Sequence, residues 1–181
     1  AKPRRRKNKD SKNYQTFRKK KEFNNQLDKC YLLLGKAYFY KKKYTMANNT
    51  FRFIQRQYAE DEALMTEVSI WLFRSLTEMG RYEEAARIMD RLDGSTLKRK
   101  QREMVAAART DFYVRQGMYE QAIPEAERLV RTCKSIKRKP RYNFLLSQLY
   151  VKENQDGAAK LALKKATRFN FNYEMVFNAR I

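Results

Sequence analysis

The sequence predicts an all-α fold, built as an array of about four helical hairpins and the start of a further helix. The chain of 181 residues holds only five glycines and three prolines. An all-β or parallel-sheet fold needs many more tight turns than these residues can serve. Hydrophobic residues make up 43% of the chain, which is enough for a sizeable core. In addition, three columns of residues recur along the chain at one fixed spacing.

These columns divide the chain into four copies. The first column is spaced by 38, 37 and 37 residues, and the other two keep the same spacings. The columns are Tyr38, Leu76, Tyr113 and Tyr150; Ala47, Ala85, Ala122 and Ala159; and Tyr44, Tyr82, Tyr119 and Asp156. A fixed period of this length is typical of stacked helical repeats, in which no single unit buries its apolar face alone.

Each copy reads as two helices joined by a short turn. We expect these pairs at 27–42 and 45–58, 67–79 and 83–92, 103–116 and 120–133, and 141–154 and 157–169. The corresponding repeats span about 28–62, 66–99, 103–136 and 140–172 of a repeat domain at 26–181. Residues 173–181 read as a C-terminal helix that covers the last pair.

The turns and the packing between paired helices follow from particular residue types. Gly80 and Gly117 stand where a first helix must end, at a position that favours positive φ. Lys42 or Lys43 and Asn154 take this place in the first and last copies. The small alanines of the second column let the paired helices approach, and Pro124 predicts a local bend in the second helix of copy three.

Residues 1–25 form a basic lead that we expect to be partly disordered. Up to residue 21 the lead holds eleven Lys or Arg and one acidic residue, and its first dozen residues show no apolar periodicity. Its main cations are Arg4, Arg5, Arg6, Lys7, Lys19, Lys20 and Lys21. Two interpretations stay open, namely contact with an anionic membrane surface or nucleic acid, and a solvated linker.

Charge and composition narrow the classes of function. The net charge of +21 predicts an acidic partner, whether nucleic acid, a membrane surface or a protein. The chain has no histidine, which removes the commonest general base and metal ligand. It also has no phosphate loop or zinc spacing. We therefore predict a protein that is not an enzyme and that uses no cofactor and no metal. Cys30 and Cys133 read as buried apolar residues, with a disulfide left open.

The copies resemble the tetratricopeptide repeat, which combines Leu-Gly, Tyr, Gly-x-Tyr, Ala, an aromatic residue and a closing Pro. Copy one carries Tyr31, Leu34, Gly35, Tyr38, Tyr44, Ala47 and Phe51. The other copies carry Leu72, Gly80, Tyr82, Ala85 and Leu92; Tyr113, Gly117, Tyr119, Ala122 and Leu129; and Leu146, Tyr150, Ala159 and Ala166. The closing proline is replaced in every copy, and the period exceeds the usual ~34 residues. The resemblance implies a right-handed superhelix with longer helices or links, which acts as a protein-binding scaffold.

A narrower resemblance is carried by the strings NNQLDKCYLLLGKAYFYKKKYTMANNTFRFIQRQY and NYEMVFNARI. They are similar to the tetratricopeptide lipoproteins of the Bacteroidetes gliding-motility and type IX secretion machinery, over residues 17–181. This implies an N-terminal piece of a longer, lipid-anchored cell-envelope protein on the periplasmic side of the outer membrane. Since the chain opens with Ala1 and Cys30 falls inside a predicted helix, we expect the lipid-bearing cysteine to lie outside this piece.

The candidate binding residues lie on the first helices, because repeat arrays bind partners through the concave face that these helices line. The outward positions are Lys29, Lys36, Tyr40, Glu67, Arg74, Glu78, Asp111, Arg115, Arg141, Gln148 and Lys152. Their cations predict a basic groove for an acidic segment, with an ordinary solvated face as the alternative. Two further basic patches, 98–102 and 134–141, fall one period apart on one edge. Trp71 and Tyr142 read as core or groove-lining residues.

Two hypotheses of function stay open. The first is a scaffold for protein–protein interaction, in a bacterial secretion or gliding-motility complex, whose protein partner offers acidic segments. The second is a basic helical repeat protein that binds nucleic acid or an anionic membrane. The second is the weaker, because part of the charge lies in the lead rather than in the repeats.

Overall fold

The computed structural model describes residues 26–92 and 97–168, and these residues form eight α-helices and no strand. The helices are α2 (Leu27–Tyr40), α3 (Tyr44–Gln57), α4 (Glu62–Glu78), α5 (Tyr82–Arg91), α6 (Arg99–Arg115), α7 (Tyr119–Thr132), α8 (Lys139–Lys152) and α9 (Asp156–Thr167). The predicted all-α hairpin array is confirmed in this part of the chain. The cations of the basic lead and the C-terminal helix expected at 173–181 lie outside the described residues.

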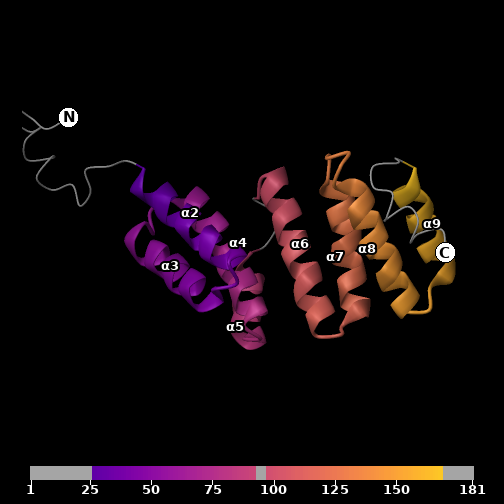
Figure 1. Ribbon diagram of the computed structural model, residues 1–181, viewed down its shortest axis with the longest axis horizontal. Helices are drawn as coiled ribbons and strands as arrows, with labels where there is room; N and C mark the ends of the chain where they lie inside the picture. The colour runs from indigo at the N-terminus through magenta and orange to yellow at the C-terminus, as the bar shows by residue number, and fades with distance from the viewer. Residues whose placement is uncertain (1–25, 93–96, 169–181) are drawn as a thin grey trace, which may run out of the picture.

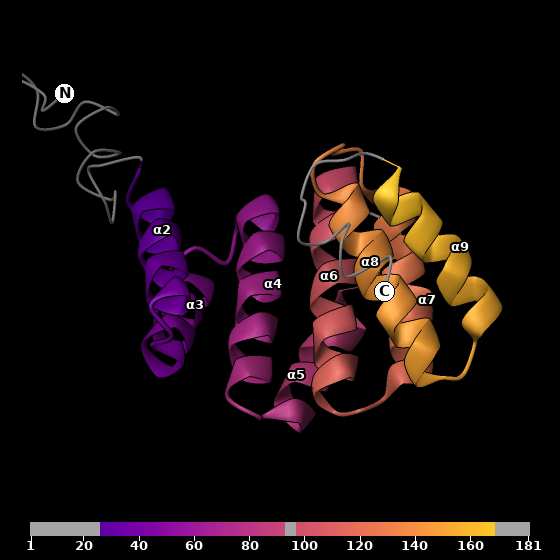
Figure 2. The ribbon, with the colours of Figure 1, turned by 45° about the vertical axis from the view of Figure 1, so that its right-hand side comes forward.

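Consecutive helices pair as hairpins, and the hairpins follow one another along the long axis of the molecule (Figure 1). The first helices are α2, α4, α6 and α8, and the second helices are α3, α5, α7 and α9. In the turned view of Figure 2, α2, α4 and α6 stand side by side. The handedness of the superhelix stays a prediction.

One turn geometry recurs in all four hairpins. Lys42, Gly80, Gly117 and Asn154 all have positive φ, at 57°, 71°, 72° and 56°. The amide that follows each of them donates to a carbonyl five residues back, as in a Schellman motif. The four accepting carbonyls belong to Tyr38, Leu76, Tyr113 and Tyr150. In each turn, the backbone carbonyl of the first-column residue therefore accepts the hydrogen bond that closes the turn.

The other two columns also have structural roles. Each second helix begins at a residue of the third column, namely Tyr44, Tyr82, Tyr119 and Asp156. The alanine column is buried at every position, with exposed fractions of 0% for Ala47, Ala85 and Ala122 and 3% for Ala159. The predicted close packing within each hairpin is thereby confirmed.

Two first helices begin earlier than the sequence pattern predicts. Both α4 and α6 have 17 residues, and they begin at Glu62 and Arg99 instead of 67 and 103. At α4 the reason is the N-cap, because the Asp61 carboxylate accepts a hydrogen bond from the Leu64 amide at 2.9 Å. The repeat boundary expected at 66 therefore falls inside α4. These longer helices account for part of the long period, as the resemblance implied.

The core divides into two main apolar clusters. The first extends from α2 to α6 and contains Phe51, Phe73 and Leu76, and the second joins α7, α8 and α9. Trp71 lies in the first cluster, as expected for a core residue. Both cysteines are free, and Cys133 is buried. The expectation for Cys30 is wrong, because Cys30 is exposed on the outer side of the first described helix.

Two further observations concern individual helices. The α7 helix runs from Tyr119 to Thr132 with Pro124 inside it, and the predicted bend at Pro124 stays a prediction. Over the described ranges, none of the helices combines the length and the apolar character that crossing a membrane requires.

Candidate functional site: a groove along the first helices

A cavity of about 480 Å³ lies against the first helices of all four hairpins. We call it the first-helix groove. It is lined by Tyr40 from α2, Arg74 and Glu78 from α4, Glu103, Met104, Ala107, Ala108 and Asp111 from α6, and Arg138 and Tyr142 at the start of α8. Segments that lie up to a hundred residues apart in the sequence thus meet at one surface.

The floor of the groove is the face of α6 that carries Met104, Ala107, Ala108 and Asp111. Their spacing of three and four residues places them on one side of the helix. The two alanines leave room above the backbone, whereas larger side chains there would fill the cavity. The sequence thus leaves a hollow between α4 and α8 at the middle of the array.

One wall of the groove is a cluster of aromatic rings with a cation set against them. The Arg74 guanidinium carbon lies 4.4 Å from the Trp71 ring centroid and 4.7 Å from that of Phe39. Tyr40 meets Trp71 edge to face at 5.7 Å. Within the described residues, no carboxylate lies within 4 Å of the Arg74 guanidinium. Cation–π contacts therefore fix Arg74 in place and leave its charge without an anionic partner.

Two of the other cations expected in a basic groove are paired with carboxylates. Lys36 binds Glu67 at 2.6 Å, and Arg115 binds Glu78 at 2.7 Å and Asp111 at 3.0 Å. The charges of these two cations are therefore compensated, and the basic groove as a whole stays a prediction. Neighbouring hairpins stack so that, in these pairs, a charged residue of one first helix faces the opposite charge on the next.

Two pKa shifts follow from this pairing. Burial opposes the charge of Arg115, but the hydrogen bond and charge of Asp111 and the charge of Glu78 raise the net pKa of the guanidinium. Burial, followed by the neighbouring Glu78 carboxylate, raises the pKa of Tyr44. Both shifts favour an intact network at the ends of α4 and α6 at neutral pH.

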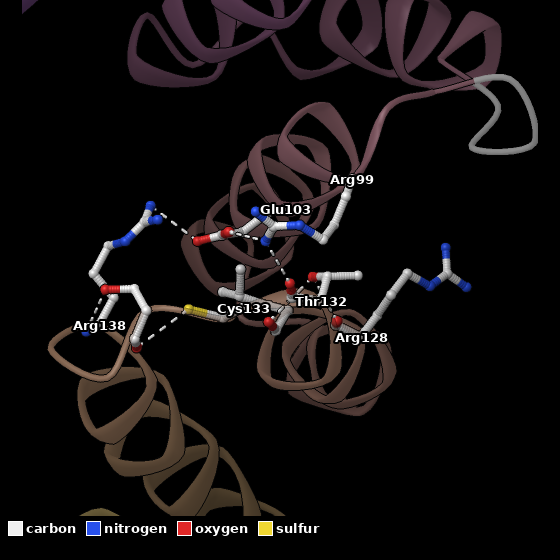
Figure 3. Close-up of polar contacts among 8 residues, drawn as sticks. Arg99, Glu103, Arg128, Thr132, Cys133 and Arg138 are labelled. Atoms are coloured by element: carbon white, nitrogen blue, oxygen red, sulfur yellow. Dashed lines mark hydrogen bonds and ion pairs between the residues drawn. The ribbon is translucent and has the colours of Figure 1, made fainter.

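At the other end of the groove, the buried carboxylate of Glu103 holds the two basic patches together (Figure 3). Glu103 is 3% exposed, and its Oε1 lies 2.9 Å from Arg138 Nη1. Arg99 Nη1 lies 3.8 Å from Oε2 and also donates to the Thr132 carbonyl at 3.2 Å. Although the Arg138 distance is short, Oε1 accepts no well-directed hydrogen bond, so we attribute this contact to charge.

The Glu103 carboxylate affects its neighbours as well. Burial raises the pKa of the Cys133 thiol, and the Glu103 carboxylate raises it further. The pKa of Tyr142 is raised for the same two reasons in the same order. The thiol contacts the Ser135 carbonyl at 3.8 Å. These shifts identify Cys133 as a protonated structural residue, consistent with its burial.

The structure separates the predicted binding residues into three groups. Those that line the groove are Tyr40, Arg74, Glu78 and Asp111. Those that pair across neighbouring first helices beside it are Lys36, Glu67 and Arg115. Those that are exposed and do not line it are Lys29, Arg141, Gln148 and Lys152. The groove thus collects four of the predicted binding residues, and the partner-binding role of all eleven stays a prediction.

Sequence reasoning missed several groove residues. Glu103, Met104, Ala107 and Ala108 lie one or two turns before Asp111 on α6, and that spacing is the signal that would have found them. Arg138 was assigned to the edge patch, but it also reaches the groove. Tyr142 lines the groove as well, which is one of the two positions expected for it.

The fold and this groove define a helical-hairpin repeat protein. A model of the tetratricopeptide repeat family matches residues 140–173, which include α8 and α9. No curated protein matches the chain. The match and the array of similar hairpins together support a tetratricopeptide repeat protein, and such repeats suggest a scaffold for protein–protein interaction. Helical repeat folds of this kind are typically not enzymes. Within residues 26–92 and 97–168, no group of three potential metal ligands gathers at one place.

Proposed function

We propose that this protein is an interaction scaffold that binds a segment of a partner protein in the first-helix groove. The proposal rests on the surroundings of Arg74. Its charge has no carboxylate partner among the described residues, and aromatic rings hold it at the edge of a cavity that four helices share. A cation held in this way is ready to pair with an incoming carboxylate at little cost in side-chain entropy.

The groove also supports a particular kind of partner segment. Arg74 and Arg138 stand on different helices around a floor that contains Met104 and two alanines. The Arg138 side chain is 55% exposed and meets Glu103 through one oxygen, so it remains open to a second anion. We infer a segment that places acidic side chains near these two arginines and an apolar side chain on the floor.

Affinity purification of the tagged full-length protein from its own cells tests this proposal. Proteins recovered with the wild type are compared with those recovered with Arg74→Gln and Tyr40→Ala. Arg56→Gln is the matched control, because Arg56 is an exposed arginine on α3 away from the groove. We expect at least one protein to be recovered about tenfold less with either groove variant and equally with the control. If neither groove substitution changes which proteins are recovered or how much of them, the groove does not bind the partner.

We further propose that the scaffold works in a bacterial secretion or gliding-motility complex at the periplasmic side of the outer membrane. The support is the likeness of residues 17–181 to the tetratricopeptide lipoproteins of that machinery. Fractionation of cells that express the tagged full-length precursor tests it. We expect a lipoprotein signal with a lipid-bearing cysteine and co-sedimentation with the outer membrane. A precursor that lacks such a signal and is found with the cytoplasmic proteins would contradict it.

The net charge of +21 favours a second candidate, binding to nucleic acid or to an anionic membrane. If phosphates carry the binding, affinity falls linearly on a logarithmic scale of salt concentration. The test uses single-stranded oligonucleotides and vesicles that contain phosphatidylserine, at about 50 mM salt. Absence of binding to both under these conditions removes this candidate.

A further inference from the structure

The strongest unassigned feature of the molecule is a cleft of about 460 Å³ on the side of α6 away from the first-helix groove. Arg102, Val105 and Arg109 of α6 line this cleft, whereas Met104, Ala107 and Asp111 line the groove. At 100° per residue these two sets fall on opposite faces of one helix. The cleft is therefore a second surface, independent of the first.

The cleft exists because α5 is short. It has ten residues, ends at Arg91 and leaves much of the outer side of α6 uncovered. Arg109 reaches across the gap, and its Nη2 donates to the carbonyls of Met89 at 3.0 Å and Leu92 at 3.3 Å. Beside the cavity the second and third hairpins are thus joined by this polar contact, in addition to the apolar cluster of Ile70, Leu92 and Val105.

Among the residues that the structure describes, positive charge in this cleft exceeds negative charge. Four arginines line the cleft, against one carboxylate, Glu125; these arginines are Arg102, Arg109, Arg128 and Arg131. The single atom Oε1 of Glu125 serves both Arg109, at 3.4 Å, and Arg128, at 3.5 Å. Both distances exceed the ~2.7–2.9 Å of a good charge-assisted hydrogen bond.

The remaining two arginines, Arg131 and Arg102, also lack a strong ion pair. Arg131 lies 3.5 Å from Glu127, with both side chains well exposed, and such a surface pair contributes little. In the described stretches, no carboxylate lies within 4 Å of Arg102. Figure 3 shows the Arg128 side chain pointing away from the Glu103 cluster. An anion that enters the cleft would therefore meet guanidinium groups that still have hydrogen-bonding capacity.

We propose that this arginine cleft binds an acidic peptide segment of a protein partner. Planar guanidinium groups match carboxylates through paired hydrogen bonds. Leu92, Leu97 and Val105 supply an apolar lining for the aliphatic side chains of such a segment. Within 26–92 and 97–168, no aromatic side chain lines the cleft, so these residues offer no platform on which the bases of single-stranded nucleic acid would stack.

Fluorescence anisotropy on the full chain tests this proposal, with a labelled eight-residue peptide that alternates Glu and Leu, at about 0.1 M salt. We expect the double variant Arg102→Gln with Arg128→Gln to bind the peptide at least about tenfold more weakly. The matched control is Lys152→Gln with Lys160→Gln, which removes the same charge from exposed positions on α8 and α9. It should bind nearly as well as the wild type. Circular dichroism verifies that both variants are folded.

Four results would overturn the proposal. The first is that the peptide does not bind, and the second is that the two double variants lose the same amount of affinity. The third is that a peptide alternating Gln and Leu binds as tightly as the Glu–Leu peptide. The fourth is that inorganic phosphate, or an oligonucleotide of the same charge, displaces the labelled peptide as well as the unlabelled Glu–Leu peptide does. The Arg74→Gln variant separates this site from the first-helix groove. Since the groove is also proposed to bind an acidic segment, the loss caused by Arg102→Gln with Arg128→Gln is measured with and without Arg74→Gln. We expect the same loss in both backgrounds, and a loss in Arg74→Gln alone would assign the peptide to the groove instead.

Discussion

Gly35 of α2 lies directly against the Phe51 ring of α3. A Cβ atom built there would lie 2.8 Å from Cζ and 2.9 Å from Cδ1 of Phe51, and the Phe51 side chain is fully buried. We expect Gly35→Ala to lower the free energy of unfolding by about 1–3 kcal/mol through overpacking, despite the higher helix propensity of alanine. Urea denaturation measures the change.

Gly157 provides the matched control for this substitution. It lies in the first turn of α9, and nothing would stand within 4 Å of an added Cβ atom. Gly157→Ala should therefore leave the stability unchanged or raise it slightly. Equal stability of Gly35→Ala and the wild type would show that α2 and α3 do not need this close contact.

Tyr150 contributes a partly buried hydrogen bond between α7 and α8. Its hydroxyl donates to Glu127 Oε1 at 2.6 Å. Burial, followed by the Glu127 carboxylate, raises the pKa of Tyr150 from 10.0 to about 12. We expect Tyr150→Phe to lower the free energy of unfolding at pH 7 by about 1–2 kcal/mol, as measured by urea denaturation.

The same shift predicts how stability depends on pH. The folded protein holds the Tyr150 proton more tightly than the unfolded chain, so this contribution is complete below pH 10. Between pH 10 and about 12 the unfolded chain releases the proton first, and stability falls as the pH rises. The stability gap between the wild type and Tyr150→Phe should therefore narrow over this range. A gap that widens would contradict the assignment.

At the scale of helices and turns, the sequence predicted what depends on local geometry. The four left-handed turn residues and the buried alanines follow from positions within a single hairpin. Lys42 and Asn154 adopt the conformation of Gly80 and Gly117, because all four copies close their turns with the same hydrogen bond. The start of α4 was missed, because the repeating columns mark the turn and the second helix but not the start of the first helix.

The ion pairs between hairpins could not be predicted from the sequence pattern. Lys36 and Glu67 are 31 residues apart, and Arg115 and Glu78 are 37 residues apart. Whether such residues meet depends on how one hairpin is rotated against the next, which no spacing rule fixes. The candidate groove was therefore located on the first helices, but the ion pairs beside it were not predicted.

Arg109 is predicted to hold the short helix α5 against the third hairpin. Besides capping the carbonyls of Met89 and Leu92, it pairs with Glu125, whose side chain is 12% exposed. We expect Arg109→Ala to lower the free energy of unfolding by about 2 kcal/mol and to speed amide hydrogen exchange in α5. Arg102→Ala, which removes an exposed arginine from the same helix, should do neither. Unchanged exchange in α5 of Arg109→Ala would refute this role.

At the scale of the whole molecule, the two main apolar clusters are linked through Phe112. Its ring lies 5.4 Å from Phe73 and 5.8 Å from Tyr82, and it packs next to Tyr113. Tyr113 also contacts the second cluster. The stacked hairpins should unfold together only as long as this link is intact, since each repeat is stabilised by its neighbours.

We therefore expect Phe112→Ala to lower the total stability by about 3–5 kcal/mol and to uncouple the two halves. Trp71, the single tryptophan, reports on the N-terminal half by fluorescence, whereas circular dichroism reports on all helices. The two denaturation curves should coincide in the wild type and separate in Phe112→Ala. Leu161→Ala, at an exposed leucine of α9, should leave the curves coincident. Coincident curves in Phe112→Ala would mean that other contacts couple the halves.

The most direct test of the scaffold account is photo-crosslinking inside living cells. A benzophenone amino acid replaces Tyr40 or Tyr142, on opposite sides of the first-helix groove, in the full-length protein. The control positions are Arg56 and Lys160, which are exposed on the second helices α3 and α9. We predict an adduct with the same partner protein from both groove positions and none from the controls. Adducts from the control positions alone, or none from the groove, would contradict partner binding along the first helices.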